Sequence, residues 1–381
     1  MGAAARFALV FRLRQSFTTK ATDAPAGQGA TTTADSRRTP RTSNAALRDA
    51  GAADCQDMLE TGHWRGALGT RPAPLLENPV TVPPPTPDDG HLLDELVNFQ
   101  EIIRQVKPSP GEMPSVPGIE IAGCSLPLHG HAGGDHILYI AFDKRYDLEA
   151  RIHAAVVAGR TEVAEQLALN RTRSGILLAD VAGHRMTDAL VAAMLHQAFL
   201  VGTYYELDMF GHITTKLFEH LKTRFFESTG LKKYVTMIYG EIDSSGTFRF
   251  ISAGHPPPLV FSREYGHFVT IAPEQVVTTT PMGMIPSTVD LDGLRHRVDD
   301  DLRERYTINE ISLMGWGDIL LLYTDGLSDH GGHLFFPAEV ERLLSDARDL
   351  PAAAICARLE EAVRAVGPAT DDISFVVVKK V

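Results

Sequence analysis

The sequence predicts an α+β fold with antiparallel sheets. Residues 234–243 and 247–252 are expected to be strands, and the Ser-Ser-Gly turn between them is typical of a β-hairpin. A second hairpin is expected between 311–313 and 318–323, through a turn that contains two glycines. Strands and helices do not alternate strictly along the chain, which argues against a doubly wound parallel sheet.

Composition limits the class of protein. Of 381 residues, 44% are hydrophobic, so a sizeable core can form. The formal net charge of −12 argues against non-specific nucleic-acid binding, which needs a basic surface. No window of about 18 consecutive apolar residues is present, so no membrane span is expected. The three cysteines, Cys55, Cys124 and Cys356, are widely spaced and odd in number. They predict neither a disulfide framework nor a zinc site, and they favour a reducing, cytoplasmic location.

Residues 1–90 are predicted to form a disordered tail that ends in a proline-rich spacer. Up to residue 43 the segment is basic, rich in Ala, Thr, Ser and Gly, and without sustained periodicity. Residues 78–90 (NPVTVPPPTPDDG) are expected to be stiff and extended. An organellar transit peptide, or a very short signal segment at 7–11, is an alternative interpretation of the basic start.

A short helix is expected at 91–107. Its apolar residues follow a heptad-like 4-3-4-3 spacing: Leu92, Leu96, Phe99, Ile103 and Val106. Pro108 is expected to end the helix. Two heptads are too few for an autonomous coiled coil. The helix is therefore expected either to pack on the main domain or to contribute to a homodimer, with a slight preference for the dimer.

Residues 117–381 are predicted to form the main domain. Further strands are expected at 119–126, 136–142, 174–181 and 373–379. Helices are expected at 147–170 with a break near Gly159, from Gly183 onward, and at 209–226, 337–348 and 351–366. In the helix after Gly183, one face is marked by Met186, Leu190, Met194 and Val201, which are predicted to be core residues.

Aspartates stand beside glycines or at strand ends in four separate segments. Asp135 follows two glycines, Asp180 ends the apolar run 174–181, and Asp325 ends a second apolar run. The pair Asp371–Asp372 directly precedes the last strand. Clustered carboxylates repel one another unless a cation joins them, and oxygen ligands favour Mg²⁺ or Mn²⁺. A single aspartate at such a turn is ordinary turn chemistry, so the inference depends on all four segments together.

Six sequence motifs occur in series along this region. They are 133–135 (GGD), 179–184 (ADVAGH), 234–240 (YVTMIYG), 252–259 (SAGHPPPL), 317–326 (GDILLLYTDG) and 371–374 (DDIS). In this order they closely resemble the bacterial sporulation stage II protein E type of metal-dependent serine/threonine phosphatases, in the PPM superfamily. The resemblance covers about residues 117–381. It implies an α-β-β-α sandwich with two Mn²⁺ or Mg²⁺ ions at one edge of the sheets.

The resemblance also implies roles for individual residues. Asp180 would bridge both metals, and the backbone carbonyl of Val181 would bind the second. Asp325 and Asp371 would hold the other metal, and Asp135 would bind a metal or a metal-bound water. Asp372 is a further candidate ligand, because the adjacent pair can be matched with a shift of one residue. His184 is a candidate general acid, the alternative being a hydrogen bond that holds the turn.

Three features depart from the family pattern. The second aspartate that usually follows Gly-Gly-Asp is absent from the run that starts at His136. Arg185 replaces a small residue and is either a phosphate-binding group or a solvated residue at the helix start. The helical stretch 145–172 is longer than the usual hairpin. It is either a partner-docking insertion or a passive surface addition.

The resemblance implies hydrolysis of phosphoserine and phosphothreonine by a water molecule that two metal ions activate. The expected substrate is a phosphorylated signalling protein similar to an anti-sigma-factor antagonist. One alternative is a catalytically weak or inactive module that binds such a partner. A third interpretation is a metal-dependent hydrolase of small phosphoesters.

Overall fold

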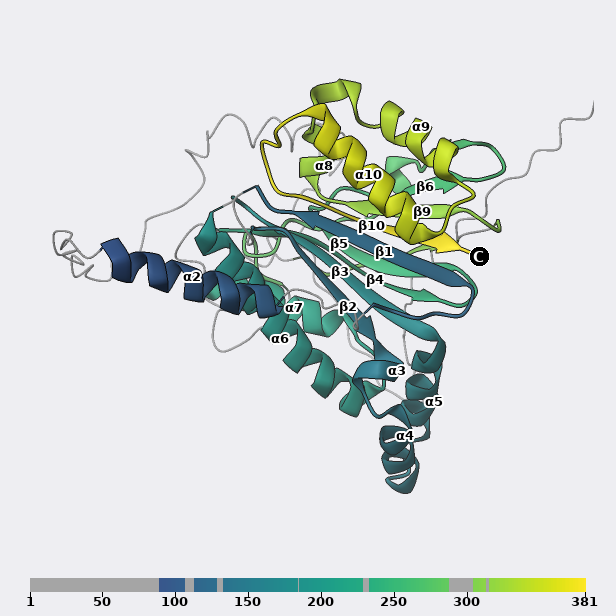
Figure 1. The fold of residues 1–381 in the computed structure, drawn as a ribbon. Coiled ribbons are helices and arrows are strands. Elements are labelled where there is room, and N and C mark those ends of the chain that lie inside the picture. The colour runs from purple at the N-terminus through teal and green to yellow at the C-terminus, as the bar shows by residue number, and fades with distance from the viewer. Residues whose placement is uncertain are drawn as a thin grey trace, which may run out of the picture. The chain divides into compact units, whose positions relative to one another are not determined.

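Two five-stranded antiparallel sheets pack face to face, and helices cover the outer face of each (Figure 1). This computed structural model describes residues 89–106, 113–128, 133–183, 185–228, 233–287, 304–312 and 315–381. The predicted tail before residue 89 and the candidate acid His184 lie outside the described residues. The prediction of an α+β fold with antiparallel sheets is confirmed.

The first sheet contains the strands nearest the C-terminus together with β1. Its spatial order is β1 (Ile119–Leu126), β10 (Ile373–Lys380), β9 (Ile319–Tyr323), β6 (Leu259–Ser262) and β7 (His267–Val269). The second sheet has the order β2 (His136–Ala141), β3 (Arg173–Val181), β4 (Val235–Asp243), β5 (Thr247–Ala253) and β8 (Asn309–Ser312). Every strand pair in both sheets is antiparallel.

Helices cover the two sheets separately. On the second sheet lie α3 (Phe142–Arg145), α6 (Met186–Phe210) and α7 (Thr215–Ser228). The helices α4 (Leu148–Val157) and α5 (Thr161–Leu169) pack on each other, and α5 packs on α6. On the first sheet lie α8 (Asp325–Asp329), α9 (Ala338–Ala347) and α10 (Ala352–Val366). The helix α2 (Asp89–Val106) contacts α6 through Phe99, which packs on Ala189. None of the described helices combines the length and the apolar character that crossing a bilayer requires.

Side-chain alternation along the strands divides the core into layers. In β3, Ile176 and Leu178 face the other sheet, whereas Leu177 and Ala179 face the helices. Residues of β10 divide in the same way between the two faces. Strands that are buried on both faces need apolar residues at every position, which explains the nearly continuous apolar runs in the sequence.

Two expectations about individual helices were tested by the structure. The helical stretch 147–170 is broken as predicted, because Gly159 adopts a left-handed conformation (φ 69°) between α4 and α5. The helix expected at 209–226 begins later, at Thr215. Gly211 takes up a positive φ of 75° and ends α6 at Phe210, so the chain turns before it starts α7.

The second predicted hairpin is wrong. Residues of β8 pair with β5 in the second sheet, whereas β9 pairs with β10 and β6 in the first sheet. The glycine-containing turn therefore carries the chain from one sheet to the other. Asp318 holds this turn, since its carboxylate accepts hydrogen bonds from the backbone N–H groups of Gly315 (2.8 Å) and Arg263 (2.9 Å).

The predicted core face of α6 is also wrong. Leu190, Met194 and Val201 are 47%, 52% and 57% exposed. The buried face of this helix is formed instead by Ala192, Leu195, Phe199 and Leu207. Apolar residues surround much of α6, so the spacing of four of them did not identify the side that packs on the sheet.

Candidate active site

Acidic side chains meet at one end of the two sheets. Asp135 precedes β2 and Asp180 lies near the end of β3, and the register pairs His136 with Ala179, which places these two aspartates side by side. Asp180 lies an even number of residues from Ile176 and Leu178 in β3. Its side chain is therefore on the same face of the strand as theirs, the face directed toward the other sheet. Asp325 and the pair 371–372 reach the same end from the first sheet, because they follow β9 and precede β10.

Asp135 is buried and tied to the other sheet. The hydroxyl of Thr324 donates a hydrogen bond of 2.8 Å to its Oδ2. Thr324 is itself held to Ser374, since its backbone N–H donates to the Ser374 carbonyl at 2.9 Å. Burial raises the pKa of Asp135 well above its usual value, and the nearby Asp180 raises it further. The position of this carboxylate is therefore set by β9 and β10 as well as by its own strand.

Asp180 is the centre of the acidic cluster. Burial, followed by repulsion from Asp325 and Asp371, raises the pKa of Asp180 to about 8. A hydrogen bond between the carboxyl groups of Asp180 and Asp325 contributes to this shift. The pKa of Asp325 is also raised, first by burial and then by Asp371. These carboxyl groups are close enough to hold a proton between them when no cation is bound.

The adjacent aspartates 371 and 372 have different surroundings. Asp372 is buried, and its two carboxylate oxygens accept hydrogen bonds of 2.6 Å from the backbone N–H groups of Leu128 and Gly134. Asp371 is exposed and repels both Asp180 and Asp325. Asp372 thus anchors the glycine-rich segment before β2, and Asp371 faces the acidic cluster.

The turn after β3 lies against Gly134. A Cβ atom on Gly134 would come within 2.6 Å of the Val181 carbonyl oxygen and 2.5 Å of the Gly183 carbonyl oxygen. The Gly134 carbonyl also accepts a hydrogen bond of 3.3 Å from the Val181 N–H. Only glycine permits this approach. The carbonyl of the candidate ligand Val181 therefore lies against the segment that carries Asp135.

An ion pair that the sequence analysis missed supports the same turn. The Lys233 ammonium lies 2.8 Å from Asp188 Oδ1 and donates a hydrogen bond of 2.8 Å to the Ala182 carbonyl. Asp188 is fully buried, and its Oδ2 accepts the backbone N–H of Arg185 at 2.8 Å. A carboxylate in the first turn of a helix is a capping signal that was visible in the sequence. The partner Lys233, 45 residues further along the chain, gave no such signal in the sequence.

His255 is buried next to β4. Its Nδ1 lies 3.1 Å from the Thr236 hydroxyl, and Thr236 is the neighbour of Asp180 across β3 and β4. Burial lowers the pKa of His255 to about 3, so the ring is neutral. The neutral ring links β4 to the segment that follows β5.

The donor set fits a hard divalent cation. All candidate ligands are oxygens, from four aspartate segments and the Val181 carbonyl, which is the chemistry that Mg²⁺ and Mn²⁺ prefer. Among the residues that the structure describes, no three His, Cys, Asp or Glu side chains are grouped closely enough to hold one ion. Asp135 and Asp372 are instead directed to Thr324 and to backbone N–H groups. Binding of an ion would require several of these carboxylates to turn toward it.

Comparison with known proteins agrees with the fold. The family model of stage II sporulation protein E (SpoIIE) matches residues 170–381. A curated relative, the phosphoserine phosphatase RsbP of Bacillus subtilis (strain 168), is 29% identical over 162 residues, which cover 42% of this chain and 34% of the relative. The match thus spans about a third of that relative's length.

Two solved bacterial structures align with this chain. The SiaA-PP2C domain of Pseudomonas aeruginosa aligns with a TM-score of 0.51 at 15% identity, over 76% of this chain and 97% of that one. The RsbU and RsbW domains of a Mycobacterium tuberculosis protein align with a TM-score of 0.49 at 24% identity, over 72% of this chain and 64% of that one. The alignment with the Pseudomonas domain extends the similarity of fold beyond the region that the family model matches.

Proposed function

Because the chain belongs to the stage II sporulation protein E (SpoIIE) family, we propose that it is a metal-dependent protein phosphatase acting on phosphoserine and phosphothreonine. The observation that carries this proposal is the meeting of Asp180, Asp325 and Asp371 at one end of two sheets. Repulsion among clustered carboxylates destabilises a fold unless a cation joins them. The relative RsbP, named as a phosphoserine phosphatase, supports the reaction class.

Each residue of the site has a distinct part in this proposal. Asp180 would be shared by two divalent cations, with Asp325 and Asp371 on one of them and the Val181 carbonyl on the other. Bound there, two cations would supply an activated water for in-line attack on phosphorus and would offset charge on the phosphoryl oxygens. Asp135 would orient the water from the position that Thr324 gives it.

The role proposed for Asp372 is structural and does not include metal binding. Both of its oxygens already accept backbone hydrogen bonds, from Leu128 and Gly134. A carboxylate held in this way at 2.6 Å positions the segment that carries Asp135. We therefore propose Asp371 as the metal ligand of the pair and Asp372 as its structural neighbour.

The substrate is proposed to be a phosphorylated signalling protein, similar to an anti-sigma-factor antagonist. An acidic chain with a net charge of −12 accepts a phosphate group only where its local charge is neutralised. Divalent cations at the acidic cluster would provide that neutralisation. The name of the relative RsbP supports phosphoserine as the group that is hydrolysed, and assays with a peptide and a small phosphoester distinguish the two kinds of substrate.

Hydrolysis assays test this function. Turnover of a phosphoserine peptide and of an aryl phosphate is measured with Mn²⁺, with a chelator, and in the Asp180→Asn variant. We expect manganese-dependent turnover that the chelator abolishes and that Asp180→Asn reduces at least 100-fold, because the shared ligand is lost. Equal rates in all samples would refute the proposal. A clear preference for the aryl phosphate would favour the third interpretation, a hydrolase of small phosphoesters.

One observation favours the alternative of a phosphatase-like module with little turnover. Within the described part of the chain, the acidic side chains are not yet arranged around a common point. If divalent cations bind there without drawing the carboxylates to a common point, the site would bind a phosphorylated partner without hydrolysing it. Binding of the phosphopeptide in the presence of Mn²⁺, with no release of phosphate, would identify this case.

A further inference from the structure

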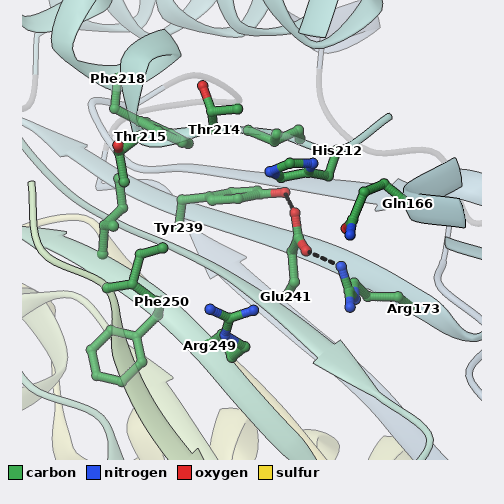
Figure 2. A pocket seen from close by; sticks show the side chains of 13 residues that line it. Gln166, Arg173, His212, Thr214, Thr215, Phe218, Tyr239, Glu241, Arg249 and Phe250 are labelled. Atoms are coloured by element: carbon green, nitrogen blue, oxygen red, sulfur yellow. Dashed lines mark hydrogen bonds and ion pairs between the residues drawn. The ribbon is translucent and has the colours of Figure 1, made fainter. Parts of the chain in front are cut away.

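The motif at 234–240 contains two tyrosines whose side chains lie on opposite faces of the second sheet. Tyr239 belongs to the core beneath the helices, and its hydroxyl donates a hydrogen bond of 3.0 Å to Glu241 (Figure 2). Ile238 belongs to the core between the sheets. Because side chains alternate along an extended segment, Tyr234 lies on the same face as Ile238. The two tyrosines therefore have different surroundings.

Tyr234 lies directly before β4 and continues the pairing of β4 with β3. The register of these strands pairs Asp180 with Thr236. Beyond the strands, the Ala182 N–H donates a hydrogen bond of 3.0 Å to the Tyr234 carbonyl. Tyr234 is thus the diagonal neighbour of Asp180 on one face of the sheet. Diagonal neighbours have their Cβ atoms about 7–8 Å apart, a distance that an aromatic side chain can span.

The strand order places Tyr234 and Asp135 on opposite sides of Asp180. The strands β2, β3 and β4 are neighbours in that order, and Asp135 precedes β2. The pKa of Tyr234 is raised, first by burial and then by Asp180 and Asp325. The phenol therefore keeps its proton at neutral pH and remains a hydrogen-bond donor beside the carboxylates of both sheets.

The hydroxyl of Tyr234 has no use in the fold that the structure shows. Among the described residues, none is hydrogen-bonded to this hydroxyl, although the side chain is half-buried. Tyrosine hydroxyls in such places usually have a partner, as that of Tyr239 does. A phosphate ester brought to the acidic cluster would present three strongly accepting oxygens. The unused donor thus lies next to the place where the proposed substrate supplies acceptors.

We propose that the Tyr234 hydroxyl donates a hydrogen bond to a phosphoryl oxygen of the substrate. Hydrogen bonds to charged oxygens are stronger than those between neutral groups, and a donor already held in place needs no reorganisation. The phenol is uncharged, so it does not compete with cations for the carboxylates. This inference rests on the proposed function, because it requires a phosphate ester at the acidic cluster.

The variant Tyr234→Phe tests the inference, because it removes only the hydroxyl. For the full chain with Mn²⁺, kcat and KM are measured with a phosphoserine peptide, and the affinity for inorganic phosphate is measured by isothermal titration calorimetry. We expect kcat/KM to fall about 10- to 100-fold and phosphate to bind about tenfold more weakly. Mn²⁺ affinity and the urea unfolding midpoint should equal those of wild type, because no described residue loses a partner.

The matched control is Tyr265→Phe. Tyr265 is exposed and lies between β6 and β7, at the end of the first sheet that is remote from Asp325. This variant should equal wild type in all four measurements, and equal losses in both variants would overturn the inference.

The remaining outcomes separate this inference from the proposed function. An active wild type whose kcat/KM and phosphate affinity are unchanged in Tyr234→Phe would overturn the inference alone. Weaker Mn²⁺ binding with unchanged phosphate affinity would also overturn it, because the hydroxyl would then hold a metal ligand. A wild type that binds phosphate without turnover would count against the proposed function, and the phosphate affinity of Tyr234→Phe would still decide the role of the hydroxyl. A wild type that neither binds phosphate nor hydrolyses the peptide would refute both.

Discussion

The hydroxyl of Thr324 donates a 2.8 Å hydrogen bond to the carboxylate of Asp135, a residue 189 positions earlier in the chain. Thr324 follows β9 of one sheet and Asp135 precedes β2 of the other. The bond thus joins the two sheets at the end where the acidic side chains meet. Thr324 is fully buried, and its hydroxyl also accepts the backbone N–H of Ser374 at 3.0 Å.

Replacing Thr324 by valine is expected to destabilise the fold. Valine keeps the shape of the side chain but removes the hydroxyl, so that Asp135 and the Ser374 N–H each lose a buried partner. The free energy of unfolding, measured with urea, should fall by about 1–3 kcal/mol. Thr324→Ser retains the hydroxyl and should lose less than half as much. A Thr324→Val variant as stable as wild type would show that the hydrogen bonds of the hydroxyl do not stabilise the fold.

The stability of the metal-free protein is expected to depend on Asp180. Its pKa is raised to about 8 in the folded state, above its usual value of 3.8. The folded state therefore binds more protons than the unfolded chain between about pH 4 and pH 8, and this contribution to stability is lost as the pH rises through that range. The free energies of unfolding of wild type and Asp180→Asn are measured with a chelator present. Wild type should lose stability relative to Asp180→Asn as the pH rises from 5 to 8. A difference that is constant or increases over this range would contradict the assignment.

The two adjacent aspartates are expected to respond in opposite ways to the same substitution. Asp372→Asn replaces one acceptor oxygen by an NH₂ group, so one of its two backbone hydrogen bonds is lost and stability should fall by about 1–3 kcal/mol. Asp371→Asn should leave stability within about 0.5 kcal/mol of wild type but abolish manganese-dependent turnover. Urea unfolding and the phosphopeptide assay measure both effects. The opposite pattern would exchange the roles of the two residues.

The ion pair between Lys233 and Asp188 is expected to stabilise the turn after β3. Lys233→Met leaves the fully buried Asp188 carboxylate without its ammonium partner. The expected loss is about 2 kcal/mol in the free energy of unfolding, less than for a completely buried pair because Lys233 is partly exposed. The double variant Lys233→Met with Asp188→Asn removes the unpaired charge and should recover part of this loss. If the double variant is as unstable as the sum of the two single ones, the two residues do not interact.

The segments that form the acidic end of the sheets were predictable because strand periodicity is local. Asp180 ends an apolar run and Asp371–Asp372 precede another, and each was placed at a strand end from the sequence. The partners of these aspartates were not predictable. Thr324, Lys233 and Leu128 reach the site through pairings between distant segments, and an isolated threonine or lysine carries no periodic signal.

The errors in the predicted fold have a related cause. A glycine-containing turn between two apolar runs predicts a hairpin, but it does not show whether the second run pairs with the first or crosses to another sheet. The strands β8 and β9 take the second course. In α6, Leu190 and Met194 share a spacing that suits a buried face, although the sheet contacts Leu195 and Phe199. The choice between two apolar faces depends on the tertiary fold.

Crystals grown in excess Mn²⁺ and measured at the manganese absorption edge test the central claim most directly. The account predicts two anomalous peaks at the acidic end of the sheets, with Asp180 between them and Asp325 and Asp371 bound to one of them. It also predicts that the Asp372 carboxylate stays with the backbone of Leu128 and Gly134. Diffraction that shows no manganese near Asp180, with its carboxyl group still within hydrogen-bond distance of Asp325, would contradict the account.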